Sequence, residues 1–431
     1  MNKFVMTLLT VNFALHADNM NVTGDSGMTV EMKTYYDKVL LKNAWPSLVH
    51  NQFGQKRNLP KGSGKIIEFR KFTPLSKKTT ALGEGVTPDG QKIAATNLTA
   101  TVAQYGSYVM FNDILETTTI DPVLQEATEL LGHQAGETLD TLTREVLMGG
   151  TTVQYGDGTH TSRSTLVGQD GTWANNDYFN CEVIRRAMLT LRNNKARPLP
   201  GGDYVCIIHP DAEYTLKKDS EWVAANNYAQ SDRIFTGEIG KFDGCRFVVS
   251  TEAKVFSGTW LTAAAKDLTF ASIGTAGTAK VITVDEAITT GEATALATRH
   301  IWLKGVKYTI ASSAAGAAGA ATITVNEAVT GTPTDGEVIN PGDITGDAAA
   351  MPDNGVDVLG CLFLGADAYG VTELEGMGLT TITKQLGSAG SADPLNQRST
   401  QGWKATHVAK ILSELWMVRA EVCSPFSRGA N

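Results

Sequence analysis

The chain has 431 residues and a mass of 46.0 kDa, with 37 Lys and Arg against 45 Asp and Glu, a formal net charge of −8. Its 42% hydrophobic and 19% charged residues are typical of a globular protein and exclude a disordered or collagen-like chain. The length allows two to three domains, and no stretch approaches the roughly 18 consecutive apolar residues that a membrane-spanning helix needs.

The N-terminal residues have two interpretations. Met1-Asn2-Lys3, an apolar stretch and Ala14-Leu15-His16-Ala17 resemble a secretory signal peptide with a cleavage site. Thr7, Thr10 and Asn12 interrupt the apolar stretch. This favours an N-terminal arm, comprising residues 1–59, rather than a signal peptide. Residues 33–78 carry eleven Lys and Arg against Asp37 and Glu68, a local charge of +9 that favours an anionic neighbour. The alternatives for this segment are contact with nucleic acid, contact with the acidic face of another subunit, and a solvated arm without such a partner.

Residues 60–105 predict a long two-stranded loop. Two segments rich in strand-forming residues, KGSGKIIEFRKFTPL and NLTATVAQYGSYVMF, flank the glycine-rich tip at 81–90. An isolated hairpin is only marginally stable in water. We therefore expect this loop to find its contacts in the core of the chain or in a neighbouring subunit.

A long helix is predicted over 121–148. Asp121 is the expected N-cap, Pro122 occupies the first helical position, and Gly149-Gly150 end the helix. Apolar residues recur at steps of three or four, which indicates one buried stripe; they are Leu124, Ala127, Leu131, Ala135, Leu139, Leu142 and Val146.

An α/β pattern begins at residue 180. Asn180 opens a helix, YVCIIHP and CRFVVST have the composition of buried strands, and the pattern resumes at VDVLGCLFLG from Val356. The segment from 416 to 422 alternates like a strand.

Residues 262–355 differ in composition from both flanking regions. Ala, Thr and Gly supply about half of them, and five Lys and Arg against ten Asp and Glu give a charge of −5. Val281–Thr289 and Thr322–Thr330 form a weak repeat of strand-like character, with a hairpin, WLKGVKYTI, between them. We expect a small acidic β-domain here, inserted between CRFVVST and VDVLGCLFLG, which we predict to be neighbours in one sheet.

The sequence contains isolated residues with catalytic character but no catalytic pattern. Gly24-Asp25-Ser26-Gly27 matches the string around a protease nucleophile, yet Ser26 is so near the start of the sequence that the base and its carboxylate have no room before it. His209 follows a predicted strand, where a hydrogen-bonded strand end is the commoner role. His160 and Asp157 fit a polar turn better than a metal site. We therefore expect no enzyme activity and no catalytic residues.

The five cysteines predict neither a metal site nor a disulfide framework. They lie at 181, 206, 245, 361 and 423, too far apart for a CxxC pair, and their number is odd. Buried reduced thiols are the simplest interpretation and fit a reducing cytoplasm. We expect no cofactor and no metal.

The order of these elements resembles the coat-protein fold of tailed bacteriophages, the Hong Kong 97 type. Several segments resemble the major capsid family typified by the coliphage N4 coat protein: TVEMKTYYDKVLLKNAWPSLVHNQFG, ALGEGVTPDGQKI, YGSYVMFNDILETTTIDPVLQEATELLG, FTGEIGKFDGCRFVVST and LGADAYG. The resemblance covers the chain outside 1–25 and outside 262–355.

This resemblance implies an α+β fold with a defined domain order. It comprises an N-terminal arm (1–59), an extended loop over a neighbouring subunit (60–105), a peripheral domain (106–179) with its spine helix (121–148), an axial domain in two parts (180–261 and 356–402) around the insertion (262–355), and a C-terminal strand returning to the peripheral domain (403–431). It implies no catalytic residues.

The resemblance also implies a function. The chain is expected to be a major capsid protein whose hexamers and pentamers form an icosahedral shell in the virion, assembled in the host cytoplasm around double-stranded DNA without sequence-specific binding. We expect a portal and a separate scaffold protein, because the segment before the first family-like stretch is too short for a fused scaffold. The alternatives are an exported bacterial surface or adhesin protein and a hydrolase that uses Ser26 or His209.

Overall fold

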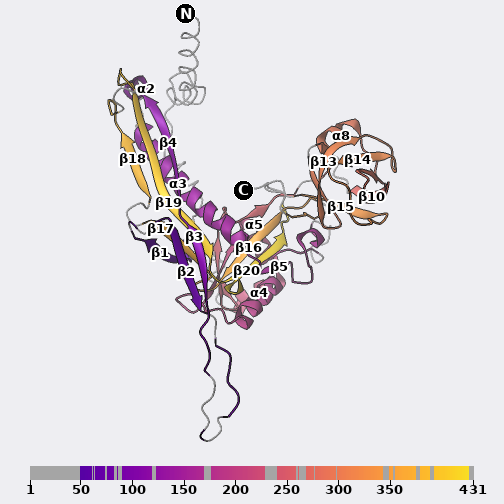
Figure 1. The fold of residues 1–431 in the computed structure, drawn as a ribbon, viewed down its shortest axis with the longest axis horizontal. Coiled ribbons are helices and arrows are strands. Elements are labelled where there is room, and N and C mark those ends of the chain that lie inside the picture. Colours follow the sequence, from indigo (N-terminus) through magenta and orange to yellow (C-terminus); the bar gives the residue numbers. More distant parts are fainter. Residues whose placement is uncertain are drawn as a thin grey trace, which may run out of the picture. The chain divides into compact units, whose positions relative to one another are not determined.

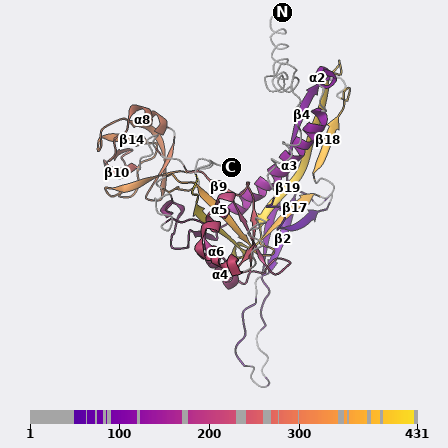
Figure 2. The same ribbon diagram turned by 180° about the vertical axis from the view of Figure 1, so that it is seen from behind.

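The computed structural model describes residues 49–426 with gaps at 61, 63, 73–74, 82–84, 86–89, 119–122, 169–175, 229–239, 259–260, 262–267, 276, 298, 343–348, 353–354, 375–378 and 389–392. The chain forms two units (Figures 1 and 2). Unit 1 comprises residues up to 143 together with 369–412, and unit 2 comprises 144–368 together with residues from 413 onward.

Unit 1 is organised around one long strand, β19. Its five-stranded sheet consists of β1 (Gln55–Leu59), β4 (Ala103–Asn112), β17 (Tyr369–Leu374), β18 (Thr380–Lys384) and β19 (Arg398–Ile411). The first part of β19 pairs with β18 on one side and β4 on the other, and its last part pairs with β17. Strand β1 adds to β17 in parallel.

Helix α3 (Val123–Met148) lies where the periodicity predicts a helix over 121–148; Asp121 and Pro122 lie outside the described residues. In unit 1 its apolar stripe is buried against the sheet, with Leu131 and Ala135 packed on Trp403 and Ala405 of β19. A short helix, α2 (Asp113–Thr118), follows β4 and precedes α3.

The expected two-stranded loop is present as β2 (Ile66–Phe72) and β3 (Ala95–Thr101), an antiparallel pair that forms a sheet of its own. All seven residues of β2 pair with β3, from Ile66 opposite Thr101 to Phe72 opposite Ala95. Beyond the strands, the two segments of the loop are still joined: the side chain of Gln91 donates a hydrogen bond of 2.9 Å to the carbonyl of Ser76.

Unit 2 contains a seven-stranded mixed sheet with helices packed on it. The strands are β5 (Val153–Tyr155), β6 (Tyr204–Ile208), β7 (Lys241–Phe242), β8 (Cys245–Val249), β9 (Val255–Phe256), β16 (Val358–Leu364) and β20 (Met417–Cys423). The helices are α4 (Cys181–Asn193), α5 (Pro210–Lys218) and α6 (Ser220–Tyr228), with single 3-10 turns at Arg163–Thr165 and Glu414–Trp416.

The α/β pattern predicted from residue 180 is found in this sheet. The Asn180 side chain accepts a 3.0 Å hydrogen bond from the backbone of Val183 and caps α4, as expected for an N-cap. Every residue of β6 and of β16 is buried, which is why both read as continuous apolar runs.

Residues 268–341 form a closed six-stranded antiparallel barrel in the order β10-β11-β14-β13-β12-β15. Its elements are β10 (Leu268–Ile273), β11 (Val281–Val284), α8 (Thr290–Leu296), β12 (His300–Leu303), β13 (Val306–Ala314), β14 (Ala321–Val325) and β15 (Glu337–Pro341). The hairpin β12–β13 turns on Lys304 and Gly305, both with positive φ, the geometry of a two-residue hairpin turn.

The sequence repeat has a structural counterpart in the barrel. Its two copies place β11 and β14 side by side, with Ile282 opposite Ile323. The Glu of each copy accepts a backbone hydrogen bond from a threonine of the preceding strand: Glu286 from Thr269 at 2.8 Å, and Glu327 from Thr309 at 3.0 Å. The repeat therefore specifies the same local arrangement twice, including a register shift in both β10–β11 and β13–β14.

The two ends of the barrel segment meet, although not as predicted. Strand β6 separates β8 from β16, so CRFVVST and VDVLGCLFLG share a sheet without being neighbours. The short strand β9 pairs with β16 instead. The carboxylate of Asp357 accepts hydrogen bonds from the Ser257 hydroxyl at 3.3 Å and the Gly258 backbone at 3.0 Å. A Cβ at Gly258 would lie 2.6 Å from the carbonyl of Gly355, so the chain enters and leaves at one point.

The C-terminal part of the chain follows a different path from the expected one. The expected boundary at 402/403 falls inside β19, whereas the chain passes between the units near 368 and 412. Strands β17 and β18, expected in the axial domain, belong to unit 1, while β20 pairs with β16 and β5 in unit 2. Local alternation cannot reveal this path because it carries no information about which strand lies alongside.

Within the described residues, no helix combines the length and the apolar character needed to cross a membrane.

We predict that residues 257–357, expressed alone, fold into a monomer that unfolds cooperatively on heating, because the barrel has its own hydrophobic core. Truncating the fully buried Ile323 to Ala should lower the free energy of unfolding by about 2–5 kcal/mol. Lys307→Ala, at an exposed position of β13, is the matched control and should change it by less than about 0.5 kcal/mol. Circular dichroism melting would measure both, and a fragment without a cooperative transition would contradict the prediction.

Candidate functional site

Among the residues that the structure describes, those with catalytic character do not form a catalytic arrangement. His209 is the N-cap of α5, where its Nδ1 accepts a 3.2 Å hydrogen bond from the backbone of Asp211. The carboxylate of Asp211 in turn contacts the hydroxyl of Ser424 at 3.3 Å. In a hydrolase the histidine must lie between the serine and the carboxylate. Here the carboxylate lies in the middle, which agrees with the structural role expected for His209.

The loop with Asp157 and His160 is a hydrogen-bonded turn. Asp157 accepts bonds from the backbone and hydroxyl of Thr159, and Nε2 of His160 lies 3.0 Å from the carboxylate of Asp177. Among the described residues, no group of three or more His, Cys, Asp or Glu is placed to hold a metal ion. Ser26 lies outside the described residues.

All five cysteines are buried and unpaired. Burial raises the pKa of the Cys181 thiol to about 12, with a further increase from Asp219, and burial also raises the pKa of Cys361 and Cys423. The thiols of Cys181, Cys361 and Cys423 are therefore protonated at neutral pH, a form that is neither a nucleophile nor a metal ligand.

A buried ion pair in unit 2 also has a structural role. Nε and Nη2 of Arg163 donate to both carboxylate oxygens of Glu421 at 2.7 and 2.8 Å. Glu421 is fully buried in β20, and the guanidinium of Arg163 lies 3.6 Å from the ring centroid of Phe256. A buried carboxylate needs such a partner because an unpaired charge in the interior is costly.

A shallow groove of about 590 Å³ lies on the sheet of unit 1. It is lined by β4, β18 and β19 and by Ser388 and Asp393. A Cβ at Gly106 would approach the carbonyl of Trp403 to 2.7 Å, and one at Gly402 would approach Cβ of Tyr108 to 2.8 Å. A side chain larger than hydrogen at either glycine would therefore clash with the neighbouring strand of the sheet.

The most unusual surface of the described chain is the β2–β3 hairpin with its extension, residues 75–81 and 90–94. We call the hairpin and its extension the arm; this arm lies within residues 60–105 and is distinct from the N-terminal arm of residues 1–59. One face of its base is buried: Ile67, Phe69 and Ala100 pack with residues of β1, β17 and β19. Its outer part instead exposes large apolar side chains, with Phe72 61%, Leu75 57% and Ile93 72% exposed. Such side chains on an extended element indicate a contact surface for another molecule.

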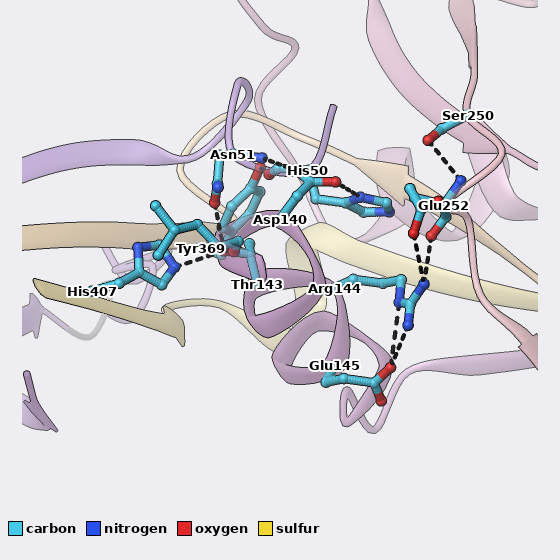
Figure 3. A network of polar contacts seen from close by, with 11 residues as sticks. His50, Asn51, Asp140, Thr143, Arg144, Glu145, Ser250, Glu252, Tyr369 and His407 are labelled. Atoms are coloured by element: carbon cyan, nitrogen blue, oxygen red, sulfur yellow. Dashed lines mark hydrogen bonds and ion pairs between the residues drawn. The ribbon is translucent and has the colours of Figure 1, made fainter. Parts of the chain in front are cut away.

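A buried polar network fixes the chain just before β1, at the base of the arm (Figure 3). Nδ1 of His50 donates to the carboxylate of Asp140 in α3 at 2.7 Å, and the backbone of Asn51 donates to its other oxygen at 3.2 Å. The hydroxyl of Tyr369 in β17 donates to the carbonyl of His50. His50 and Tyr369 are fully buried and Asp140 is 1% exposed. These bonds hold residues 50–51 between α3 and the sheet.

Thr143 extends this network to β19. Its hydroxyl donates to the side-chain oxygen of Asn51 at 2.5 Å and lies 2.9 Å from Nε2 of His407. A hydroxyl has one proton, so His407 must donate from Nε2 when Thr143 donates to Asn51. Burial lowers the pKa of His407, with a smaller opposing effect of Asp140, so its imidazole is neutral at neutral pH.

A second set of charged contacts in Figure 3 belongs to unit 2. Arg144 donates to the carbonyl of Glu252 at 2.8 Å and to the carboxylate of Glu145 at 2.9 Å, and Nζ of Lys254 lies 2.9 Å from the same carboxylate. Burial alone would raise the pKa of Glu145, but Lys254 and Arg144 lower it overall. The carboxylate is therefore ionised and joins two elements of unit 2.

Sequence reasoning found the arm but missed the network. The arm was visible as two β-forming segments around a turn. The network joins residues 50, 140, 143, 369 and 407, and its only signal was the polar Asp140 and Thr143 next to the apolar stripe of the helix.

Comparison with known proteins supplies a family match and a fold. A family model described as phage capsid protein matches residues 96–292. The fold is similar to the capsid of Ralstonia phage GP4, with a TM-score of 0.54, 12% identity, and 95% of this chain and 99% of that chain covered. The acid-stable capsid of Helicobacter pylori bacteriophage KHP30 is similar with a TM-score of 0.53 and 10% identity, and the match covers 94% of this chain and 99% of that chain. The capsid of cyanophage P-SCSP1u is similar with a TM-score of 0.50 and 13% identity, and the match covers 93% of this chain and 96% of that chain. No curated protein sequence matches the chain.

We predict that acid destabilises unit 1 through His407. Because burial lowers its folded pKa below the ordinary value of about 6.5, the unfolded chain takes up a proton first as the pH falls. The stability associated with the neutral imidazole is present above about pH 6.5 and is lost as the pH falls from there through the folded pKa. Urea unfolding at successive pH values should show this loss, and His407→Gln should remove it.

His133→Gln, on the less buried face of α3, is the matched control and should leave the pH dependence in place. An unchanged pH profile in His407→Gln would contradict the assignment.

Proposed function

We propose that this chain is the major capsid protein of a bacteriophage head, the subunit from which the shell of a tailed double-stranded DNA phage is built. The agreement of two findings carries the proposal: the family match at residues 96–292 and the likeness of the whole fold to phage capsids point to the same class of protein. The family match gives the class, and the likeness over more than nine-tenths of the chain shows that the fold suits it.

The finer assignment is a Hong Kong 97-type coat protein of the family typified by the coliphage N4 coat protein. Three features support it: the exposed two-stranded arm, the long helix α3 on the sheet of unit 1, and the separate α/β sheet of unit 2. In this assignment unit 1 is the peripheral domain with the extended loop, the sheet of unit 2 is the axial domain, and the barrel is an insertion into it.

The function is structural. In a capsid subunit the chemistry consists of contacts between copies, many of modest strength, summed over a closed lattice. The histidines, cysteines and ion pairs described above stabilise the subunit and leave the arm as its main exposed contact element.

The assembly that we propose contains hexamers and pentamers of this chain in an icosahedral virion shell, formed in the host cytoplasm with a separate scaffold protein and a portal. Double-stranded DNA is packaged inside without sequence-specific binding. The net charge of −8 supports this, because a negative wall does not adhere to a polyanion. The +9 charge of residues 33–78 favours contact between subunits.

The alternative of an exported surface protein depends on residues 1–17, which lie outside the described residues. The hydrolase alternative depends on Ser26, also outside them, and on His209, which caps a helix. The family match favours neither.

Deleting Thr80–Ala94 tests the proposal. These residues form the outer part of the arm, and in the described part of this segment they contribute to no hydrophobic core of the subunit. The purified intact chain should give closed or curved shells in negative-stain electron microscopy, whereas the deletion should leave a folded subunit that makes none.

Circular dichroism and thermal unfolding of the deletion variant supply the control, because they should match those of the intact chain. Absence of shells from the intact chain, both alone and when it is expressed together with the scaffold protein, would overturn the proposed function. Normal shells from the deletion variant would overturn only the role of the arm.

Replacing residues 259–354 with a short glycine-serine linker should leave both the sheet of unit 2 and the shell intact. The physical reason is that Gly258 and Gly355 are already in contact and the barrel has a core of its own. When this variant is expressed together with the scaffold protein, microscopy should show shells of normal diameter with less mass per subunit. Subunits that fold but do not assemble would show instead that the barrel takes part in contacts between copies.

A further inference from the structure

The groove on unit 1 lies on the face of the sheet that is opposite helix α3. Trp403 and Ala405 of β19 pack on the helix. Because side chains alternate along a strand, Gly402 and Lys404 face the other side, and both line the groove. The strands that line it, β4, β19 and β18, are neighbours in the sheet (Figure 1). The groove therefore belongs to unit 1 of a single subunit.

The centre of the groove is an apolar trough. In one row across three strands, Tyr108 of β4 lies opposite Gly402 of β19, and Gly402 lies opposite Ile382 of β18. Because Gly402 has no side chain, only backbone lies between the two walls formed by Tyr108 and Ile382. These walls are 65% and 43% exposed. Large apolar side chains exposed on the face of a sheet are typical of a surface that another molecule covers.

Positive charges lie on both sides of this trough. Lys384 and Lys404 each lie two residues beyond it along their strands, β18 and β19, and because these strands are antiparallel the two lysines lie on opposite sides of it. Neither lysine forms an ion pair with a described residue. The carboxylate of Asp393 also lines the groove, but it is 6% exposed and accepts a 2.8 Å hydrogen bond from the backbone of Arg398. The groove is thus apolar at its centre and basic at its sides.

The spacing of these side chains selects the form of a partner. Two residues along a strand span about 6.8 Å, so each lysine is about that far from the row of the trough. An extended segment places side chains i, i+2 and i+4 on one face at the same spacing. The walls are two strand spacings apart, about 9.6 Å, which is narrower than a helix with its side chains, about 10–12 Å. The complementary segment is therefore extended, with Asp or Glu at i, a large apolar residue at i+2, and Asp or Glu at i+4.

The sequence of this chain contains no such segment. Two Asp or Glu residues lie four positions apart only in 343–347 and 353–357, where the middle residue is Thr in the first and Gly in the second. The arm of a second copy is unsuitable as well, because its exposed lysines have the same charge as Lys384 and Lys404. The occupant that the chemistry of the groove favours is therefore a different protein.

We propose that this groove binds a separate protein through an extended segment of the form acidic-x-apolar-x-acidic. Its carboxylates pair with Lys384 and Lys404, and its apolar side chain lies between Tyr108 and Ile382. The site is complete within one subunit, so binding does not require assembly and is independent of the proposed function.

A labelled peptide tests the groove. The probe is Ser-Glu-Thr-Phe-Thr-Glu-Ser with acetyl and amide ends and a fluorescent label, and fluorescence anisotropy with the purified full-length subunit measures its binding. It should bind saturably, and the same peptide with both Glu replaced by Lys should bind at least about tenfold more weakly. Equal binding of the two peptides, or no saturable binding of the Glu peptide, would overturn the proposal.

Charge reversal in the groove provides matched variants. Lys384→Glu with Lys404→Glu should weaken binding of the Glu peptide about tenfold and make the Lys peptide the tighter ligand, because the pairs are again of opposite sign. Ile382→Glu, at an exposed position of the trough, should weaken the Glu peptide by a similar factor. Lys77→Glu with Lys78→Glu, an equal change of charge on the exposed arm, is the control and should leave both affinities unchanged.

Circular dichroism of each variant checks that the subunit stays folded. Loss of peptide binding in the arm variant, with binding retained in the groove variants, would place the peptide on the arm and overturn the proposal.

Assembly in the presence of the peptide decides between a separate partner and a second copy. A groove that binds another protein leaves the contacts between copies unaffected, so light scattering should show shells forming at the same rate and yield with saturating peptide. A peptide that blocks assembly would show that a second copy covers the groove, and the proposal would be wrong. If the chain forms no shells with or without the peptide, the proposed function fails, while the peptide affinities still decide about the groove.

Discussion

The pairing of β19 with β4 is the contact on which unit 1 depends. All 10 residues of β4 pair with β19, from Asn112 opposite Arg398 to Ala103 opposite His407. Because β19 also pairs with β17 and β18, one strand holds together segments that lie far apart in the sequence. Helix α3 has a surface to pack on only once this ladder has formed, and the arm lies immediately before β4 in the chain.

The buried network of His50, Asp140, Thr143 and His407 complements this ladder. Hydrogen bonds in the interior contribute modest net stability, but leaving one of these groups unpaired would cost about 1–3 kcal/mol. Their geometry therefore selects one position for residues 50–51 more than it adds to the overall stability. Nε2 of His50 is buried with no partner among the described residues, so the arrangement is not fully satisfied.

The arm and the barrel are two different ways of adding a segment to this framework. The barrel closes on itself and has its own core. The chain enters and leaves the barrel segment at Gly258 and Gly355, which lie in contact. The arm buries only its base and leaves its outer apolar and basic side chains exposed. A closed barrel has no free strand edge, whereas a two-stranded arm must complete its contacts with another molecule.

The sequence by itself determined the elements whose pattern is local: the helix of α3, the two strands of the arm, the buried strands β6 and β16, and the β character of residues 262–355. Each is encoded in residue spacing, since apolar periodicity and turn residues act over a few positions. Only the tertiary structure decided that β6 separates β8 from β16, that β19 and β20 belong to different units, and that His50 meets Asp140. Those choices depend on contacts between residues far apart in the chain, which compete with other pairings of similar local quality and leave no mark in the spacing of either partner.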